Sequence, residues 1–199
     1  FSKAAETPNE ALLQYITARH DDKAAQWLTQ HIALFGLPVT SEEVDLAEPS
    51  DGEVDAWIDI LVETADRNAD RLSDSEPDVS IVIPVYNQIR YTISCLVSLL
   101  AHPGKYTMEL LIGDDCSTDG TGKLDSLSIP GLRYIRHPNN LGFLKNCNKV
   151  AESARGRYIL MLNNDTVTLP EWLDSLIDTL ESEDDVGLVG SKLVYPDGR

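Results

Sequence analysis

Cysteine is scarce in this chain of 199 residues, which has only Cys95, Cys116 and Cys147 and no CxxC pair. An odd number of widely spaced cysteines argues against a disulfide framework or a zinc site and indicates a reducing compartment. Long apolar runs are also missing, since none approaches the roughly 20 residues that cross a bilayer. The N-terminus lacks the basic and then apolar pattern of a secretory signal. We therefore expect no transmembrane segment and a cytoplasmic location, with peripheral attachment to the inner face of a membrane as an open alternative.

Basic residues are few: 16 Lys and Arg stand against 33 Asp and Glu, which gives a formal net charge of −17 at pH 7. Such a chain repels phosphate backbones, so no nucleic-acid partner is expected. Hydrophobic residues make up 42% of the chain, which is enough for a core of ordinary size. Because the chain begins with Phe1 rather than Met, we expect it to be a piece of a longer protein.

The acidity is concentrated in the first part of the chain. Residues 1–77 hold 17 acids and 5 bases, and they end in the polar, Pro-terminated stretch 72–77, which is typical of a linker. Apolar residues at helical spacing between positions 25 and 35 predict one helix there. A capping box of Ser50 and Glu53 begins a second helix. We therefore divide the chain into an acidic α-helical segment with linker, residues 1–77, and a second domain, residues 78–199.

Beyond residue 77, short apolar runs alternate with helical patterns. The expected strands are 79–83, 108–112, 132–135 and 158–162, and the expected helices are 91–100, 120–127, 141–153 and 170–177. This alternation predicts an α/β fold, a Rossmann-like and mostly parallel sheet with helices on both faces. Residues 186–190 are a candidate fifth strand.

Polar residues follow each expected strand, at the edge where parallel sheets bind ligands. Asp114 and Asp115 follow the second strand, and Asp165 follows the fourth. Acids gathered at one edge repel one another unless a cation or hydrogen-bond donors are present. Mg²⁺ or Mn²⁺, completed by phosphate oxygens, fits this supply of ligands. The alternative, that each Asp caps the next helix, explains one Asp per turn but not the pair.

Several common motifs are absent or incomplete. No GxGxxG follows the first strand and no GxxxxGK[ST] occurs, so neither a nicotinamide cofactor nor a P-loop is supported. Residues 115–120 are similar to the start of a calcium loop, but the twelfth position is Ser126 instead of the required Glu, and we reject that motif. A nucleotidyltransferase would need a Gly-rich basic loop at residues 86–90, which is not there.

Four segments occur in order: SIVIPVYN (80–87), GDDCSTDGT (113–121), NNLGFLKNCN (139–148) and LMLNNDT (160–166). With them, residues 79–199 resemble the nucleotide-sugar-binding half of the family 2 glycosyltransferases, which have the glycosyltransferase A fold. The resemblance implies nothing about residues 1–77.

The resemblance assigns roles to individual residues. The nucleoside would be surrounded by Pro84, Tyr86, Asn87, Asp114 and Asp115. The third segment would add Asn140, Gly142, Lys145 and Asn148 to the nucleotide site, with Lys145 as a charge partner for phosphate. The family's DXD motif falls on Asn163, Asn164 and Asp165, which gives Asp165 the Mg²⁺ or Mn²⁺ that bridges the diphosphate, while the two amides contact sugar or ribose. Because the first position is Asn and not Asp, one carboxylate is lost.

The implied function is transfer of a sugar from a nucleotide-diphosphate sugar to a hydroxyl of a glycan or lipid-linked acceptor, with inversion, as in polysaccharide biosynthesis. The family's catalytic base lies in the following acceptor-binding half, so we expect it beyond Arg199 and expect this excerpt alone to be inactive. The alternative is a noncatalytic nucleotide-binding or protein-interaction module with the same fold, for which Asn163 and the missing base leave room. The donor's base and sugar, the acceptor and the oligomeric state are left open.

Overall fold

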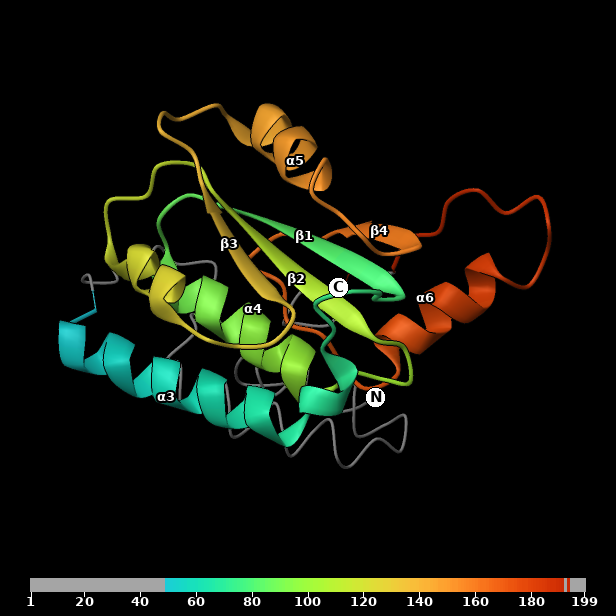
Figure 1. Ribbon diagram of the computed structural model, residues 1–199, viewed down its shortest axis with the longest axis horizontal. Coiled ribbons are helices and arrows are strands. Elements are labelled where there is room, and N and C mark those ends of the chain that lie inside the picture. The colour runs from blue at the N-terminus through green and yellow to red at the C-terminus, as the bar shows by residue number, and fades with distance from the viewer. Residues whose placement is uncertain (1–48, 192, 194–199) are drawn as a thin grey trace, which may run out of the picture. The chain divides into compact units, whose positions relative to one another are not determined.

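The computed structural model describes residues 49–191 and 193, so the helix expected between positions 25 and 35 lies outside them. The described helices and strands all belong to one compact unit, Pro49–Asp184. In chain order they are α3 (Asp51–Arg67), η1 (Ala69–Arg71), β1 (Val79–Val85), α4 (Ile89–Ala101), β2 (Met108–Asp114), η2 (Gly120–Ser126), β3 (Leu132–Arg136), α5 (Phe143–Ala151), β4 (Tyr158–Met161) and α6 (Trp172–Leu180) (Figure 1).

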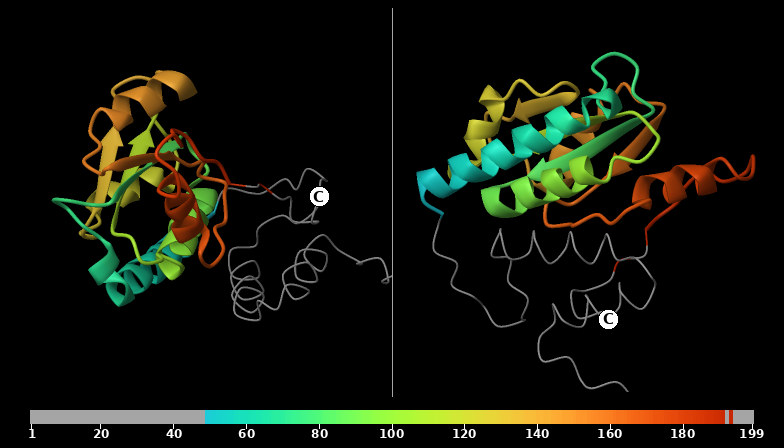
Figure 2. Two further views of the ribbon diagram at one scale, coloured as in Figure 1. Left: turned by 90° about the vertical axis from the view of Figure 1, so that its right-hand side faces the viewer. Right: turned by 90° about the horizontal axis from the view of Figure 1, so that it is seen from below.

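The four strands form a parallel sheet in the order β3-β2-β1-β4. Helix α5 covers one face, and α4 with α3 behind it covers the other (Figures 1 and 2). Every residue of β1 and β2 is buried, because these central strands have helices on both sides. The predicted α/β fold with a parallel sheet is confirmed.

Helix α3 is part of this unit. It begins with the expected capping box, in which the Ser50 side chain accepts from the Glu53 backbone N–H and the Glu53 carboxylate accepts from the Ser50 backbone N–H. Its apolar face, with Val54, Trp57 and Leu61 buried, packs on α4. The domain boundary expected after residue 77 differs from this arrangement, since an amphipathic helix has to bury its apolar face and α3 does so against the α/β layers.

Two other expected elements differ from the structure. In place of the helix expected at 120–127, the structure has the 3₁₀ helix η2, Gly120–Ser126, with Gly120 and Gly122 lowering α-helix propensity and Asp119 capping the turn. Residues 186–190, the candidate fifth strand, form no strand in the described chain. Glycine at two of these five positions lowers strand propensity.

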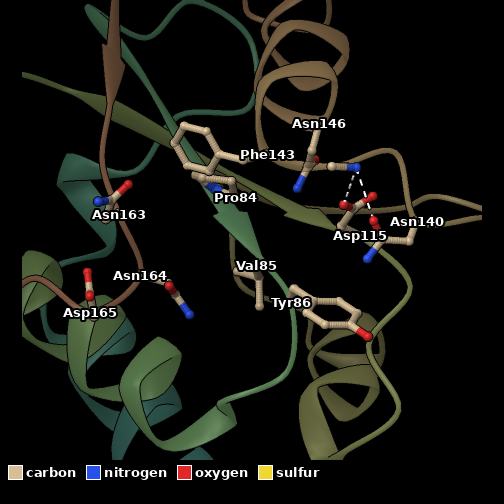
Figure 3. A pocket seen from close by; sticks show the side chains of 11 residues that line it. Pro84, Val85, Tyr86, Asp115, Asn140, Phe143, Asn146, Asn163, Asn164 and Asp165 are labelled. Atoms are coloured by element: carbon tan, nitrogen blue, oxygen red, sulfur yellow. Dashed lines mark hydrogen bonds between the residues drawn. The ribbon is translucent and has the colours of Figure 1, made fainter.

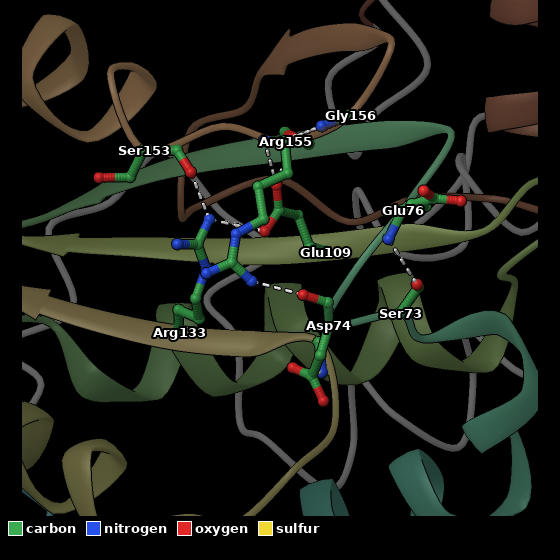
Figure 4. A network of polar contacts seen from close by, with 10 residues as sticks. Ser73, Asp74, Glu76, Glu109, Arg133, Ser153, Arg155 and Gly156 are labelled. Carbon is green, nitrogen blue, oxygen red and sulfur yellow. Dashed lines mark hydrogen bonds and ion pairs between the residues drawn. The ribbon is translucent and has the colours of Figure 1, made fainter.

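A buried carboxylate organises the amino-terminal end of the sheet (Figure 4). Glu109 of β2 accepts hydrogen bonds from Ser80 Oγ at 2.5 Å, from the backbone N–H of Arg155 at 2.7 Å and from Arg133 Nη2 at 2.7 Å. Arg133 also donates to the carbonyl oxygen of Ser153. These contacts fix the connection between α5 and β4 at the end of the strands opposite to the carboxyl edge.

Candidate nucleotide-binding site

A pocket of about 410 Å³ opens at the carboxyl ends of β1, β2 and β4. It is lined by Pro84, Val85, Tyr86, Asp115, Asn140, Gly142, Phe143, Asn146, Asn163, Asn164 and Asp165 (Figure 3). These residues come from strand ends, from the loop between β3 and α5 and from the first turn of α5. This is where the topology of a parallel sheet places a ligand.

The structure brings eight of the twelve predicted site residues together in this pocket. The eight are Pro84, Tyr86, Asp115, Asn140, Gly142, Asn163, Asn164 and Asp165. Asn87, Asp114, Lys145 and Asn148 do not line it. The sequence pattern therefore predicts the correct edge of the sheet. It does not distinguish neighbours within one segment, such as Asp114 and Asp115, of which only Asp115 lines the pocket.

Asp115 holds the loop that leads into α5. Its Oδ1 accepts from the backbone N–H of Leu141 at 2.6 Å, and its Oδ2 accepts from that of Gly142 at 2.8 Å. Gly142 has a φ of 80°, a left-handed conformation that glycine adopts without strain. The same N–H also reaches Asn140 Oδ1 at 3.1 Å. Each Asp115 oxygen retains a lone pair for a ligand, so this carboxylate shapes the pocket wall and can also accept from what binds there.

Asp114 faces away from the pocket and is fully buried. It accepts from the Ser117 backbone N–H at 2.8 Å and from the Tyr134 hydroxyl at 2.5 Å, and it forms an ion pair with Arg136. Burial alone would raise the pKa of Asp114, but the hydrogen bonds from Ser117 and Tyr134 and the Arg136 charge outweigh it and lower that pKa. The nucleoside contact implied for Asp114 therefore has no open carboxylate to act through. Its role is to organise the loop after β2.

Asn87 is likewise used within the protein. Its backbone N–H donates to Ser117 Oγ at 2.7 Å, and its Oδ1 accepts from the Thr118 backbone N–H at 2.7 Å. It thereby ties the loop after β1 to the loop after β2. Lys145 and Asn148 are exposed on α5 outside the pocket lining, so the phosphate contact expected of Lys145 has no support in the geometry.

The segment after β4 presents Asp165 to the pocket. Asn164 Nδ2 donates to Thr92 Oγ1 of α4 at 3.0 Å, which anchors this segment. Within the described chain no hydrogen bond or ion pair meets the Asp165 carboxylate, which is exposed. Burial, together with the Asp165 charge, raises the pKa of the Cys95 thiol to about 12. Cys95 is therefore a neutral packing residue and not a nucleophile.

A divalent ion fits this pocket only together with a ligand. No three His, Cys, Asp or Glu side chains group for metal binding within residues 49–191 and 193. None of the lining residues is basic, whereas two of them are acids. An anionic diphosphate would be repelled by Asp115 and Asp165 unless a cation came with it. Mg²⁺ or Mn²⁺ commonly uses one or two carboxylates plus substrate phosphates, and the free Asp165 carboxylate matches that mode.

Three lining residues were not predicted from the sequence: Val85, Phe143 and Asn146. Val85 lies between two residues that were predicted. Phe143 and Asn146 are three positions apart in the first turn of α5 and so share a helix face, which was the available signal. Among the described helices, none combines the length and the apolar character that a membrane span requires.

Comparison with known proteins gives several relatives. The chain is 33% identical over 110 residues to the succinoglycan biosynthesis protein ExoO of Rhizobium meliloti, which is 55% of this chain and 31% of that protein. It is 24% identical over 120 residues to the glycosyltransferase GlyG of Streptococcus pneumoniae, which is 59% of this chain and 40% of that protein. The chain thus spans between about a third and two fifths of the length of these relatives.

Two solved structures are partly similar to this chain. S. aureus TarS has a TM-score of 0.47 at 24% identity, over 53% of this chain and 32% of that one. The mannosyltransferase PcManGT from Pyrobaculum calidifontis, in complex with GDP-Man and Mn²⁺, has a TM-score of 0.48 at 16% identity, over 87% of this chain and 44% of that one.

The sequence also matches a family profile over more than half of the chain. The profile of the family described as Glycosyl transferase family 2 matches residues 80–199, the part of the chain that contains the sheet, the pocket and Asp165. The chain belongs to glycosyltransferase family 2.

Proposed function

We propose that this chain binds a nucleotide-diphosphate sugar as the donor-binding part of an inverting glycosyltransferase. The donor lies across the carboxyl edge of the sheet, with its nucleoside beside the end of β2 and its diphosphate beside Asp165. The acceptor is a hydroxyl of a glycan or of a lipid-linked glycan, and the location is cytoplasmic or at the inner face of a membrane.

The observation that carries the proposal is the placement of Asp115 and Asp165 on two sides of one pocket. Asp115 follows β2 and Asp165 follows β4, and in the sheet β1 lies between these strands. The pocket volume of about 410 Å³ is within the range for small-molecule sites. Asp115 is compensated by backbone donors, whereas Asp165 is left free to meet a cation.

Asp165 would hold the Mg²⁺ or Mn²⁺, with Asn163 and Asn164 beside it offering amide groups to the sugar or ribose. When bound, such an ion neutralises charge on the departing diphosphate as a Lewis acid. Asn164 is held by Thr92, so the segment that carries Asp165 is already positioned in the free protein.

Inverting transfer also needs a base that takes the proton of the acceptor hydroxyl. Among the acids of the described pocket, Asp115 is engaged by the N–H groups of Leu141 and Gly142, and Asp165 is assigned to the ion. We place the base beyond Arg199, in the length of the relatives that this chain does not span. The isolated chain would then bind the donor without catalysing transfer of its sugar.

The test is calorimetric titration of UDP, dTDP and GDP into the chain with and without Mn²⁺. We expect one nucleotide to bind only with Mn²⁺ and Asp165→Asn to abolish that binding, because the substitution removes the charge at nearly constant shape. Asp125→Asn is the matched control, since Asp125 is an exposed acid outside the pocket.

If a folded wild-type chain binds none of the three nucleotides, or if Asp165→Asn binds as tightly as the wild type, the proposed donor site is wrong. The alternative of a noncatalytic interaction module with this fold would then be favoured.

A further inference from the structure

Asn146 is a buried amide whose orientation is fixed by its neighbours. It is 1% exposed, and its Nδ2 donates to the carbonyl oxygen of Gly113 at 2.7 Å. A backbone carbonyl can only accept, so the opposite amide orientation would place two oxygens face to face at that distance. The nitrogen of Asn146 therefore has to face the end of β2.

His137 secures the other half of the amide. Its Nε2 lies 3.0 Å from Asn146 Oδ1, and because that oxygen is an acceptor, Nε2 carries the proton. The His137 side chain is 6% exposed, and its backbone N–H donates to the carbonyl oxygen of Asp114 at 2.9 Å. A Cβ at Gly113 would clash with Asn146 Oδ1, so glycine is needed for this close approach of α5 to β2.

One hydrogen of the Asn146 amide is left for the pocket. An amide nitrogen has two N–H groups, and the structure gives Nδ2 of Asn146 one partner, Gly113. The Asn146 side chain points from α5 into the pocket (Figure 3). Because the amide cannot turn over, this position offers a donor and not an acceptor to whatever binds there.

The position of Asn146 indicates which part of the ligand it meets. Asn146 contacts the end of β2, and Asp165 follows β4, with β1 between the two strands. If the diphosphate lies at Asp165, the nucleoside lies at Asn146. Ribose hydroxyls both donate and accept, so a fixed donor does not discriminate among them, whereas a keto oxygen on the base differs sharply from an amino group.

We infer that Asn146 is a specificity-determining residue that selects a base with a keto oxygen, a 4-oxo pyrimidine or a 6-oxo purine, and that His137 is the positioning residue that holds its amide. The inference rests on the proposed function, because it requires a nucleotide in this pocket. A base with an amino group at that point would set two donors against each other and leave the buried amide hydrogen unpaired.

The experiment compares matched nucleotides in the presence of Mn²⁺ by calorimetry: UDP with CDP, and IDP with ADP. For the wild type we expect the keto member of at least one pair to bind about tenfold or more tightly than its amino partner. Asn146→Ala should lower the affinity for the keto nucleotide and bring the keto-to-amino ratio close to one. His137→Phe should reduce the keto-to-amino ratio, because it removes the N–H donor to Asn146. His137→Gln keeps an N–H donor and should have a ratio close to that of the wild type. Lys149→Ala, at an exposed position of the same helix, is the control.

Equal binding of keto and amino nucleotides by the wild type would overturn the inference while leaving the proposed function intact. An unchanged ratio in folded Asn146→Ala would do the same. If Asn146→Ala does not fold, the wild-type ratio and its response to His137→Phe decide the matter. Absence of any nucleotide binding by the wild type would instead refute the proposed function.

Discussion

The two neighbouring acids at the end of β2 have different environments. Asp114 belongs to the strand and Asp115 is the first residue after it, and successive side chains of an extended chain point to opposite sides. Asp114 meets Tyr134 and Arg136 of β3, and its register partner on that strand is Arg136. Asp115 instead turns to the loop before α5. A conformational rule at the level of one residue thus separates a structural carboxylate from one in the pocket.

Asp114 makes the stability of the protein depend on pH. Its pKa is lowered in the folded state, so its contribution to stability is complete above the unfolded pKa of about 4 and is lost as the pH falls through the folded pKa. We expect Asp114→Asn to destabilise the protein at pH 7 by about 3 kcal/mol or more, because Arg136 loses its carboxylate partner and one of the two acceptor oxygens becomes an NH₂ donor that meets another donor. Below pH 4 the difference between wild type and variant should shrink. Urea unfolding across this pH range measures both effects, and a difference that stays constant would contradict the assignment.

The close approach at Gly113 gives a second prediction for a single residue. Gly113→Ala places a methyl group against the Asn146 amide and the Val150 side chain, so α5 has to move away from the end of β2. We expect a loss of about 1–3 kcal/mol in the free energy of unfolding and weaker nucleotide binding. Gly122→Ala is the control, because a Cβ there meets no atom within 4 Å. Chemical denaturation of both variants, followed by nucleotide titration, is the measurement.

At the scale of elements, the loop before α5 depends on Asp115. Asp115→Asn replaces one acceptor oxygen with an amide nitrogen, which cannot accept from the N–H of Leu141 or Gly142. We expect faster amide hydrogen exchange at these two residues and loss of nucleotide binding, with the sheet unchanged. Unaltered exchange at both amides would show that the loop is held in another way.

The opposite end of the sheet depends on Glu109, which fixes the connection between α5 and β4. Glu109→Ala leaves the Arg133 guanidinium without its carboxylate and the buried Ser80 hydroxyl without its acceptor. We expect a loss of about 3–5 kcal/mol in the free energy of unfolding, as is typical when one partner of a buried pair is removed. Glu152→Ala is the matched control, since its ion pair with Lys149 is exposed and contributes little. Denaturant unfolding distinguishes the two variants.

For the whole molecule, ligand binding and folding are linked. The described residues include no group of three or more His, Cys, Asp or Glu side chains that could hold a metal. Mn²⁺ alone should therefore leave the melting temperature unchanged. Nucleotide in the presence of a chelator should also leave it unchanged. Together they should stabilise the folded state by about 2.7 kcal/mol at a ligand concentration of 100 times Kd. Thermal unfolding followed by fluorescence tests this, and an equal shift with Mn²⁺ alone would show an ion site that does not need the diphosphate.

Much of the fold could be read from local sequence. Residues 79–83 and 108–112 are apolar except for Ser80 and Glu109, as expected of strands buried on both faces. Their alternation with helical patterns predicted a parallel sheet. The polar residues after each run then had to meet at one edge, which located the pocket. The membership of α3 in the same unit was not predicted, because its acidic face and the polar stretch 72–77 suggested a separate segment. An apolar helix face shows that the helix is buried on one side, but not which element it packs against.

The sequence by itself determined the class of fold, the edge of the sheet that carries the pocket and the motifs that mark family 2. These follow from local patterns of hydrophobicity and from polar residues at strand ends. The tertiary structure decided which side chains reach the pocket: Asp115 and not Asp114, and Asn146 and not Lys145. That choice depends on partners supplied by other elements, such as Arg136 of β3 for Asp114 and His137 for Asn146, and such pairings exist only once the strands and α5 are packed together.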